Sequence, residues 1–162
     1  MVTVIAPLSG TMVPLDQVPD DVFSQGLVGW GTAMRPTTPH VNVIAPVTGR
    51  VSTIFPHAFA LDTPDGVQIL VHLGIDTISL HGDGFTLHHN QGDTVTQGEL
   101  MITWDTTPAL AAGLDLACPI LAVQHPRDAL YLENVPRDPH QPVTQGVPLF
   151  HIDKPSLSTM QE

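Results

Sequence analysis

Proline and glycine are spread along the whole chain and divide it into short segments. Sixteen prolines and thirteen glycines interrupt the 162 residues, and the segments between them are rich in side chains that favour extended backbone. Only residues 107–112 look helical, because Pro108 stands near the start of this segment and Gly113 follows it. The pattern predicts an all-β protein with little helix, with strands over residues 2–5, 11–14, 32–36, 41–44, 49–55, 58–62, 68–73, 94–95, 100–105, 120–124 and 148–152.

Two short motifs occur twice. Ile5-Ala6-Pro7-Leu8-Ser9-Gly10 returns as Ile44-Ala45-Pro46-Val47-Thr48-Gly49, and Val95-Thr96-Gln97-Gly98 returns as Val143-Thr144-Gln145-Gly146. Repeats as few and irregular as these do not fit a solenoid and favour a closed sandwich or barrel with related halves. We expect a single domain over residues 1–154, followed by a polar C-terminal tail over residues 155–162.

The charge balance limits the classes of partner. Sixteen acidic residues against five basic ones give a formal net charge of -11, which opposes nucleic acid and anionic membrane surfaces and suits a basic protein partner. A single cysteine, Cys118, excludes an intrachain disulfide framework, and we read it as a small packing residue. Neither a targeting segment nor a membrane-spanning apolar run is evident, so a cytoplasmic location without membrane insertion is expected.

Two histidines flank a predicted hairpin. His72 stands in the apolar run Val71-His72-Leu73-Gly74, His57 lies upstream, and Thr63-Pro64-Asp65-Gly66 between them predicts a tight reversal. If Thr63 pairs with Gly66, His57 faces His72 and both rings share one face. If Gly66 forms a bulge, the register shifts by one residue and the rings lie on opposite faces. The apolar pattern fits both registers and does not decide between them.

Histidine is the available nucleophile. A neutral imidazole, common at physiological pH because the ordinary pKa is near 6.5, can accept a phosphoryl group and release it readily. A second imidazole beside it can hydrogen-bond the phosphoryl oxygens, and Asp76 could orient a ring or meet a partner's arginine. The segment 91–100 resembles the hammerhead turn of biotinyl and lipoyl carrier domains, but the only lysine, Lys154, lies outside it. A lysine-borne group is therefore not expected.

Several motifs in a fixed order resemble one family. Segments 5–10, 18–23, 44–49, 57–59 and 71–77 resemble the glucose-type IIA domain of the bacterial phosphoenolpyruvate-dependent sugar phosphotransferase system, and the resemblance continues through segments 81–85 and 91–93. The resemblance covers about residues 4–153 and implies an antiparallel β-sandwich or barrel-sandwich fold. Segment 110–116 looks closer to the β-glucoside branch of the same family, so the sugar is left open.

The resemblance implies a role for each histidine. His72 Nε2 would take a phosphoryl group from the histidine of HPr and pass it to a cysteine of the IIB domain, with His57 as the supporting imidazole in the same shallow depression. We therefore adopt the register that places His57 opposite His72. The carbonyl of Gly74 would accept the Nδ1 proton of His72, and Asp76 would support the phosphoryl site. No cofactor is required by this scheme.

The resemblance also implies a recognition surface that HPr and IIB would share in turn. Regulated transporters or kinases are further candidate partners, and His57 and His72 could share Zn²⁺ with a partner's carboxylate. One difference from the family pattern is that only Pro56 separates Phe55 from His57, so a threonine that supports the second ring in the family has no counterpart. The predicted partner-binding residues are apolar with an acidic border, and they are Asp20, Val22, Phe23, Val28, Phe55, Leu70 and Ile78.

Two functions of other classes stay open at this point. His57, His72 and Asp76 are a plausible ligand set for a zinc-binding or metal-dependent hydrolase module. A binding module whose phosphorylation state regulates other proteins is the third interpretation. The neighbouring pair His88 and His89 is a weaker metal candidate, because adjacent strand residues point to opposite faces of a sheet.

Overall fold

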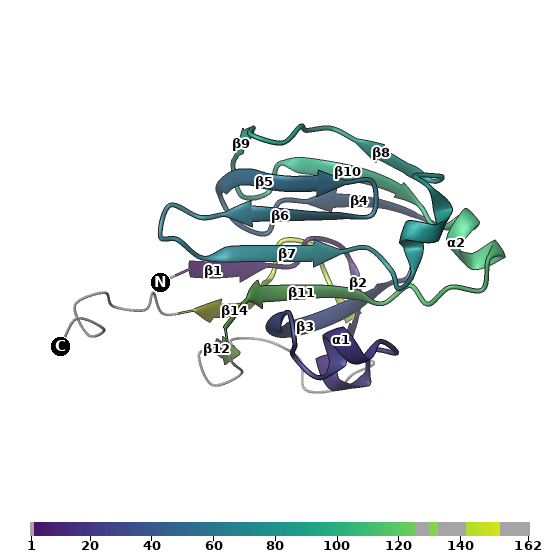
Figure 1. Ribbon diagram of the computed structural model, residues 1–162, viewed down its shortest axis with the longest axis horizontal. Coiled ribbons are helices and arrows are strands. Elements are labelled where there is room, and N and C mark those ends of the chain that lie inside the picture. The colour runs from purple at the N-terminus through teal and green to yellow at the C-terminus, as the bar shows by residue number, and fades with distance from the viewer. Residues whose placement is uncertain (1, 126–129, 133–141, 153–162) are drawn as a thin grey trace.

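The computed structural model describes residues 2–125, 130–132 and 142–152, and the predicted tail over residues 155–162 lies outside these ranges (Figure 1). The helical elements are η1 (Leu15–Gln17), α1 (Asp21–Ser24), η2 (Thr77–Leu80) and α2 (Thr107–Ala111). No helix in the described ranges is long and apolar enough to cross a membrane. The strands are β1 (Val2–Ile5), β2 (Gly10–Val13), β3 (Gly29–Pro36), β4 (His40–Ile44), β5 (Gly49–Phe55), β6 (Ala58–Asp62), β7 (Gln68–His72), β8 (Phe85–Leu87), β9 (Thr94–Val95), β10 (Leu100–Asp105), β11 (Cys118–Val123), β12 (Leu130–Leu132), β13 (Pro142–Val143) and β14 (Pro148–Ile152).

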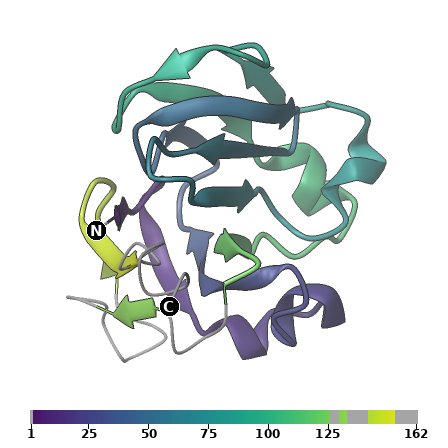
Figure 2. The same ribbon diagram turned by 60° about the vertical axis from the view of Figure 1, so that its left-hand side comes forward.

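The strands form three antiparallel sheets around one main core. The large sheet has eight strands in the order β13-β2-β3-β11-β7-β6-β5-β9, and the two smaller sheets are β1-β14-β12 and β4-β10-β8. Trp104, Phe59 and Phe150 come from different sheets and are fully buried in the core between them. Figure 2 shows the strands curving around this interior. The prediction of an antiparallel all-β sandwich is confirmed.

The two copies of the repeated Ile-Ala-Pro motif are hydrogen-bonded to each other. The amide of Ile5 donates to the carbonyl of Pro46 at 3.1 Å, and the amide of Ile44 donates to the carbonyl of Pro7 at 2.9 Å. This exchange satisfies backbone groups that would otherwise be orphaned where the chain crosses the interior. The related halves expected from the repeats are therefore joined by matching bonds in both directions.

Each copy of this motif also holds one copy of the second repeated motif. Ala6 exchanges two backbone hydrogen bonds with the turn at residues 146–147, and Ala45 exchanges two with the turn at residues 98–99. The glutamine of each turn then bridges two carbonyls through its amide nitrogen, Gln145 reaching those of Pro7 and Asn42 and Gln97 reaching those of Pro46 and Thr3. Equivalent glutamine side chains therefore connect the two halves.

Most predicted strands are found within a few residues of their expected bounds, but the prediction of a single helix is wrong. The structure adds α1, η1 and η2, and it adds strands β8, β12 and β13. Helix α1 has only four residues, too few for an apolar period to show in the sequence. Asp20 stabilises it by accepting hydrogen bonds from the amides of Val22 at 2.9 Å and Phe23 at 3.4 Å.

The adopted register of the β6–β7 hairpin is wrong by one residue. Ala58 pairs with His72, and Phe59 pairs with Val71. Gly66 takes a left-handed conformation with φ of 83° and donates its amide to the carbonyl of Thr63 at 3.0 Å. This is the three-residue loop with a glycine bulge, which shifts the pairing by one. Val71 therefore points into the core, and His72 lies on the outer face of the sheet.

We expect Gln145→Ala to lower the free energy of unfolding by about 1 kcal/mol, because the side chain donates two hydrogen bonds that hold the halves together. Gln97→Ala removes the equivalent pair and should cost a similar amount. Urea unfolding of both variants measures the effect. Unchanged unfolding midpoints in both would contradict a stapling role for these glutamines.

Candidate functional site

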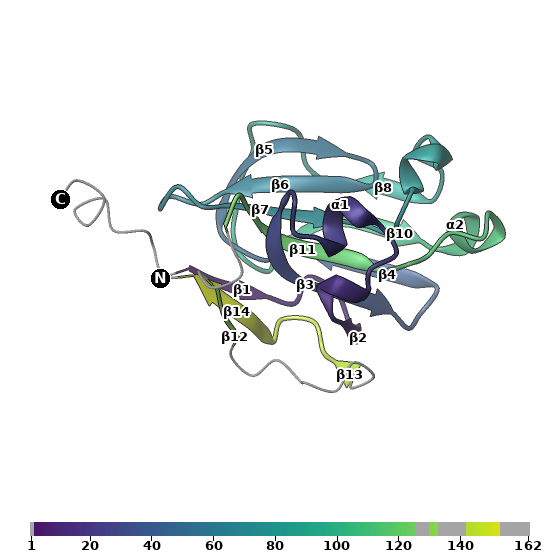
Figure 3. The same cartoon turned by 60° about the horizontal axis from the view of Figure 1, so that its bottom comes forward.

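His72 ends strand β7 on the outer face of the large sheet, where α1 covers the neighbouring strands (Figure 3). The ring of Phe23, from α1, lies against the ring of His72 with centroids 5.1 Å apart and planes tilted by 53°. Phe23 belongs to a second small core on this face, and Leu70 packs against the same cluster. One side of the imidazole is thus shielded by apolar groups.

His57 reaches His72 in spite of the shifted register. It does not belong to a strand, because it lies with Pro56 in the turn that joins β5 to β6. Side-chain alternation therefore does not apply at this position, although its carbonyl still accepts the amide of Leu73 at 2.7 Å. The rings of His57 and His72 meet edge to face, with centroids 5.2 Å apart and planes at 74°. Phe55 stacks against His57, with ring centroids 6.1 Å apart.

Gly74 fixes the tautomer of His72. Nδ1 of His72 lies 2.6 Å from the carbonyl oxygen of Gly74. A carbonyl oxygen can only accept, so Nδ1 carries the hydrogen and Nε2 keeps its lone pair. Gly74 has φ of 79°, and a Cβ at this position would lie 2.6 Å from Cγ2 of Thr77. The turn that presents the carbonyl therefore requires glycine.

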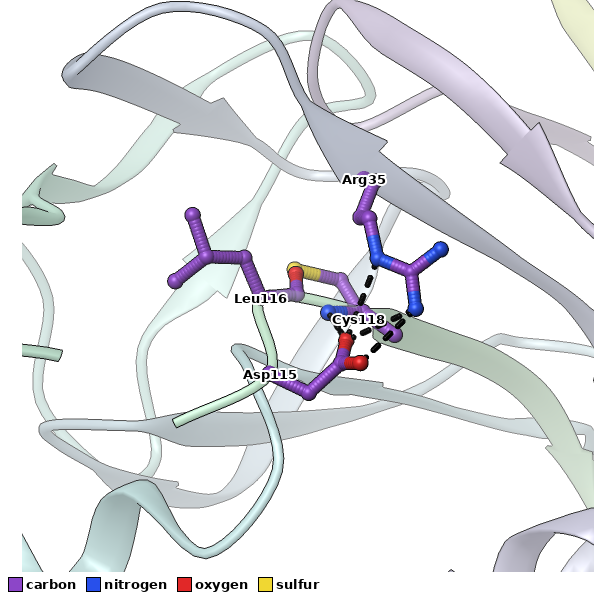
Figure 4. A network of polar contacts seen from close by, with 5 residues as sticks. Arg35, Asp115, Leu116 and Cys118 are labelled. Carbon is purple, nitrogen blue, oxygen red and sulfur yellow. Dashed lines mark hydrogen bonds and ion pairs between the residues drawn. The ribbon is translucent and has the colours of Figure 1, made fainter. Parts of the chain in front are cut away.

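A polar network supports this turn from the neighbouring strands (Figure 4). The amide of Ile75 donates to the carbonyl of Asp115 at 2.9 Å, and the carboxylate of Asp115 pairs with Arg35 at 2.8 Å. Neither residue is predicted from the sequence as part of the site, because eighty positions separate them and no local pattern joins them. The nearby thiol of Cys118 is buried, and burial raises its pKa to about 12, which fits the expected packing role.

Burial determines the protonation of both histidines. Burial is the largest influence on His72 and lowers its pKa below the ordinary value of 6.5, and the nearby charge of His57 lowers it further. The contact with Gly74 and the charges of Asp20 and Asp76 oppose this shift without reversing it. Burial also lowers the pKa of His57. The neutral form of both rings is therefore favoured at and above pH 6.5, and a neutral ring can act as a nucleophile.

The two predicted acidic residues are placed differently. Asp20 uses its carboxylate to cap α1, whereas Asp76 is exposed and begins η2 with φ of 61°. The hydroxyl of Ser79 donates to the carbonyl of Asp76 at 2.8 Å. The carboxylate of Asp76 thus stays at the surface beside the histidine pair, close enough to act on the charge of His72.

The predicted partner-binding residues fall into two groups. Val22, Phe55 and Ile78 are exposed by 49%, 56% and 67%, respectively. Phe23 is buried, and Val28 and Leu70 are partly buried against the second core, so these three support the surface from below. Leu27 was not predicted, yet it is 69% exposed and its amide bonds to the carbonyl of Val22. An apolar residue in a turn beside a glycine was the only sequence signal for it.

The described residues offer no cluster of three or more histidine, cysteine, aspartate or glutamate side chains that could hold a metal ion. His57, His72 and Asp76 therefore do not form the ligand set that the hydrolase alternative needs. The ring of His89 lies between the carboxylates of Asp93 at 3.2 Å and Glu99 at 2.8 Å, an arrangement in which both ring nitrogens already have partners.

Comparison with known proteins identifies the family of this site. Residues 2–127, well over half of the chain, match the family described as phosphoenolpyruvate-dependent sugar phosphotransferase system, EIIA 1. The chain belongs to this family. Its structure is also similar to that of glucose permease IIA from Mycoplasma capricolum, with 35% sequence identity and a TM-score of 0.79 over 91% of this chain and 93% of that chain. The family resemblance predicted from the motifs is confirmed, and the protein is a IIA component with a phosphotransfer role.

In this IIA protein we expect Gly74→Ala to change the environment of the His72 ring as well as to lower the stability of the fold. The new methyl group meets Thr77 at 2.6 Å and the positive φ adds about 1 kcal/mol of strain. Gly113→Ala is the matched control, because Gly113 has φ of 73° with nothing within 4 Å of the added Cβ. Only Gly74→Ala should shift the imidazole ¹⁵N resonances of His72. Equal spectra for the two variants would contradict the role of the Gly74 carbonyl.

The lowered pKa of His72 gives a second prediction for the IIA protein, on acid stability. A histidine whose pKa is lower in the folded state takes up its proton more readily when unfolded, so stability is complete above pH 6.5 and falls as the pH drops below it. NMR titration should place His72 below 6.5, and His72→Asn should reduce the loss of stability between pH 6.5 and 5. A His72 titration at or above 6.5 would contradict the effect of burial.

Proposed function

We propose that this IIA protein accepts a phosphoryl group on Nε2 of His72 from phospho-HPr and passes it to a cysteine of a IIB domain during sugar uptake. The contact between Nδ1 of His72 and the Gly74 carbonyl carries this proposal, because it leaves Nε2 as the nucleophilic atom. Residues 1–154 would form the phosphocarrier domain. The exchange with HPr places the proposed function in the cytoplasm.

The lone pair of Nε2 attacks phosphorus while the bond between phosphorus and the HPr imidazole breaks, and the departing electron pair returns to that imidazole. Nδ1 keeps its proton throughout. The Gly74 carbonyl accepts that hydrogen bond and stabilises the positive charge that develops on the ring. In the second step a IIB thiolate attacks the same phosphorus, a sulfur–phosphorus bond forms, and the electron pair of the broken bond returns to Nε2.

His57 is proposed as the residue that holds the phosphoryl oxygens. Its ring meets His72 edge to face at 5.2 Å, which allows an N–H group to point toward a group on Nε2. Phe23 lies against the ring of His72, with ring centroids 5.1 Å apart. A covered site limits access of water, and this favours transfer to a partner over hydrolysis of the phosphohistidine.

The surface around His72 suits a basic partner with an apolar centre. Exposed Val22, Phe55 and Ile78 supply apolar contact, and exposed Asp76 adds negative charge to a chain of net charge -11. HPr and IIB must each reach the same nitrogen, so the two partners exclude each other. We propose that Leu27 extends this shared surface, since it is exposed beside Val22. Zn²⁺ shared by His57 and His72 with a partner's carboxylate stays a prediction.

Incubation with phosphoenolpyruvate, enzyme I and HPr tests the proposal. We expect wild type to gain one acid-labile phosphate, His72→Ala to gain none, and His57→Ala to be labelled but to transfer to IIB at least about tenfold more slowly. His88→Ala is the matched control, because His88 is exposed and bonds to Thr103 on another sheet.

Three outcomes of this assay are decisive. A labelled His72→Ala would move the phosphoryl site to another residue. Normal onward transfer by His57→Ala would defeat the supporting role of that ring. A wild-type protein that stays unlabelled and retains stoichiometric zinc after dialysis would overturn the relay in favour of a metal-binding function.

A further inference from the structure

The peptide unit between Gly74 and Ile75 is bound at both ends. Its carbonyl oxygen accepts the Nδ1 hydrogen of His72 at 2.6 Å, and its N–H donates to the backbone carbonyl of Asp115 at 2.9 Å. The carbonyl and the amide hydrogen belong to one rigid plane. The direction in which the carbonyl meets His72 is therefore set by where the Asp115 backbone lies.

The backbone of Asp115 is in turn fixed by its own side chain. The carboxylate accepts two hydrogen bonds from Nη2 of Arg35 at 2.9 and 2.8 Å and one from Nε at 3.1 Å. It also accepts the amide of Ala117 at 2.8 Å. Arg35 belongs to β3, which pairs along the length of β11, so the guanidinium is anchored on the strand beside this segment. Figure 4 shows the fork of Arg35 closing on the carboxylate.

We propose that Arg35 and Asp115 are positioning residues for His72. They act through the Asp115 carbonyl and the Gly74–Ile75 peptide, and this inference rests on the proposed phosphoryl transfer at that histidine. The hydrogen bond on the N–H side polarises the peptide, so its carbonyl oxygen becomes a stronger acceptor for the imidazole N–H. The pair thereby both aims and strengthens the contact that stabilises the charged ring during transfer.

The packing around this peptide leaves little room for an alternative arrangement. A Cβ at Gly74 would lie 3.3 Å from the Asp115 carbonyl oxygen and 3.5 Å from Trp104, so the turn touches both. Cys118 adds a further contact, because its sulfur accepts the amide of Gly74 and its thiol donates to the carbonyl of Leu116 at 3.2 Å. A shift of residues 115–117 would therefore move the turn that holds His72.

The test compares Arg35→Gln, Arg35→Lys and Asp115→Asn in the full chain with Arg50→Gln as the matched control. Arg50 is an exposed arginine on β5, and its replacement removes one positive charge, as Arg35→Gln does, without touching the Gly74 turn. We expect the rate of phosphoryl transfer from phospho-HPr to His72 to fall about tenfold in Arg35→Gln and Asp115→Asn and less in Arg35→Lys. The double variant Arg35→Gln/Asp115→Asn should be no slower than the slower of its two single variants, because the pair acts as a unit.

NMR of the unphosphorylated protein supplies a measurement that would stay unchanged if Arg35 and Asp115 only stabilised the fold. The His72 Nδ1–H signal should exchange faster with water and the Nε2–H tautomer should gain population in both charge-removing variants, with Arg50→Gln unchanged. If Arg35→Gln does not fold, Arg35→Lys and Asp115→Asn carry the same comparison.

The outcomes separate this inference from the proposed function. Wild-type rates and an unchanged His72 tautomer in folded variants would overturn the positioning role while leaving His72 as the phosphoryl acceptor. A wild-type protein that is not phosphorylated would overturn the proposed function, and the tautomer measurement would still decide whether Arg35 and Asp115 orient the ring. Variants that lose stability alone, with normal rate and tautomer, also overturn the inference.

Discussion

The structure depends on the hydrogen bonds that the two Ile-Ala-Pro turns exchange inside the sandwich. Ile5 reaches Pro46 and Ile44 reaches Pro7, so each turn supplies the acceptor that the other requires. A turn in a protein interior is unfavourable unless its backbone groups find partners, and here the partner is a copy of the same sequence. This exchange joins the ends of β1 and β4, one strand from each small sheet, at the turns that lead into β2 and β5 of the large sheet.

Strand order in that sheet brings the site together. Strands β3, β11 and β7 are consecutive neighbours in the sheet. Arg35 near the end of β3, Asp115 just before β11 and Gly74 just after β7 therefore lie at the same end of these antiparallel strands. These three residues are far apart in the sequence, and only the pairing of the strands brings them together. The orientation of His72 at the end of β7 therefore depends on the positions of β3 and β11. The position of the Gly74 carbonyl, which fixes the tautomer, depends on contacts with distant segments as well as on its own turn.

The sequence predicted the strands well because proline and glycine mark strand ends locally, whereas the details of the site depend on contacts that no local pattern records. The bulge at Gly66 shifted the β6–β7 register, and His57 reached His72 only because it lies in a turn where strand alternation fails. Phe23 was expected at the surface but is buried, since a four-residue helix folds it onto the sheet. The pairing of Arg35 with Asp115 had no signal at all.

The electrostatics of His72 suit the proposed carrier role. Burial favours the neutral ring, while the nearby charges of Asp20 and Asp76 favour the protonated one, and burial prevails. If His72 carries the phosphoryl group as proposed, the same two carboxylates repel that group and raise the free energy of the phosphorylated state. A basic partner neutralises this repulsion only while it is docked. In the proposed relay the acidic border would thus favour docking of the phosphorylated protein on a basic partner over its remaining free in solution.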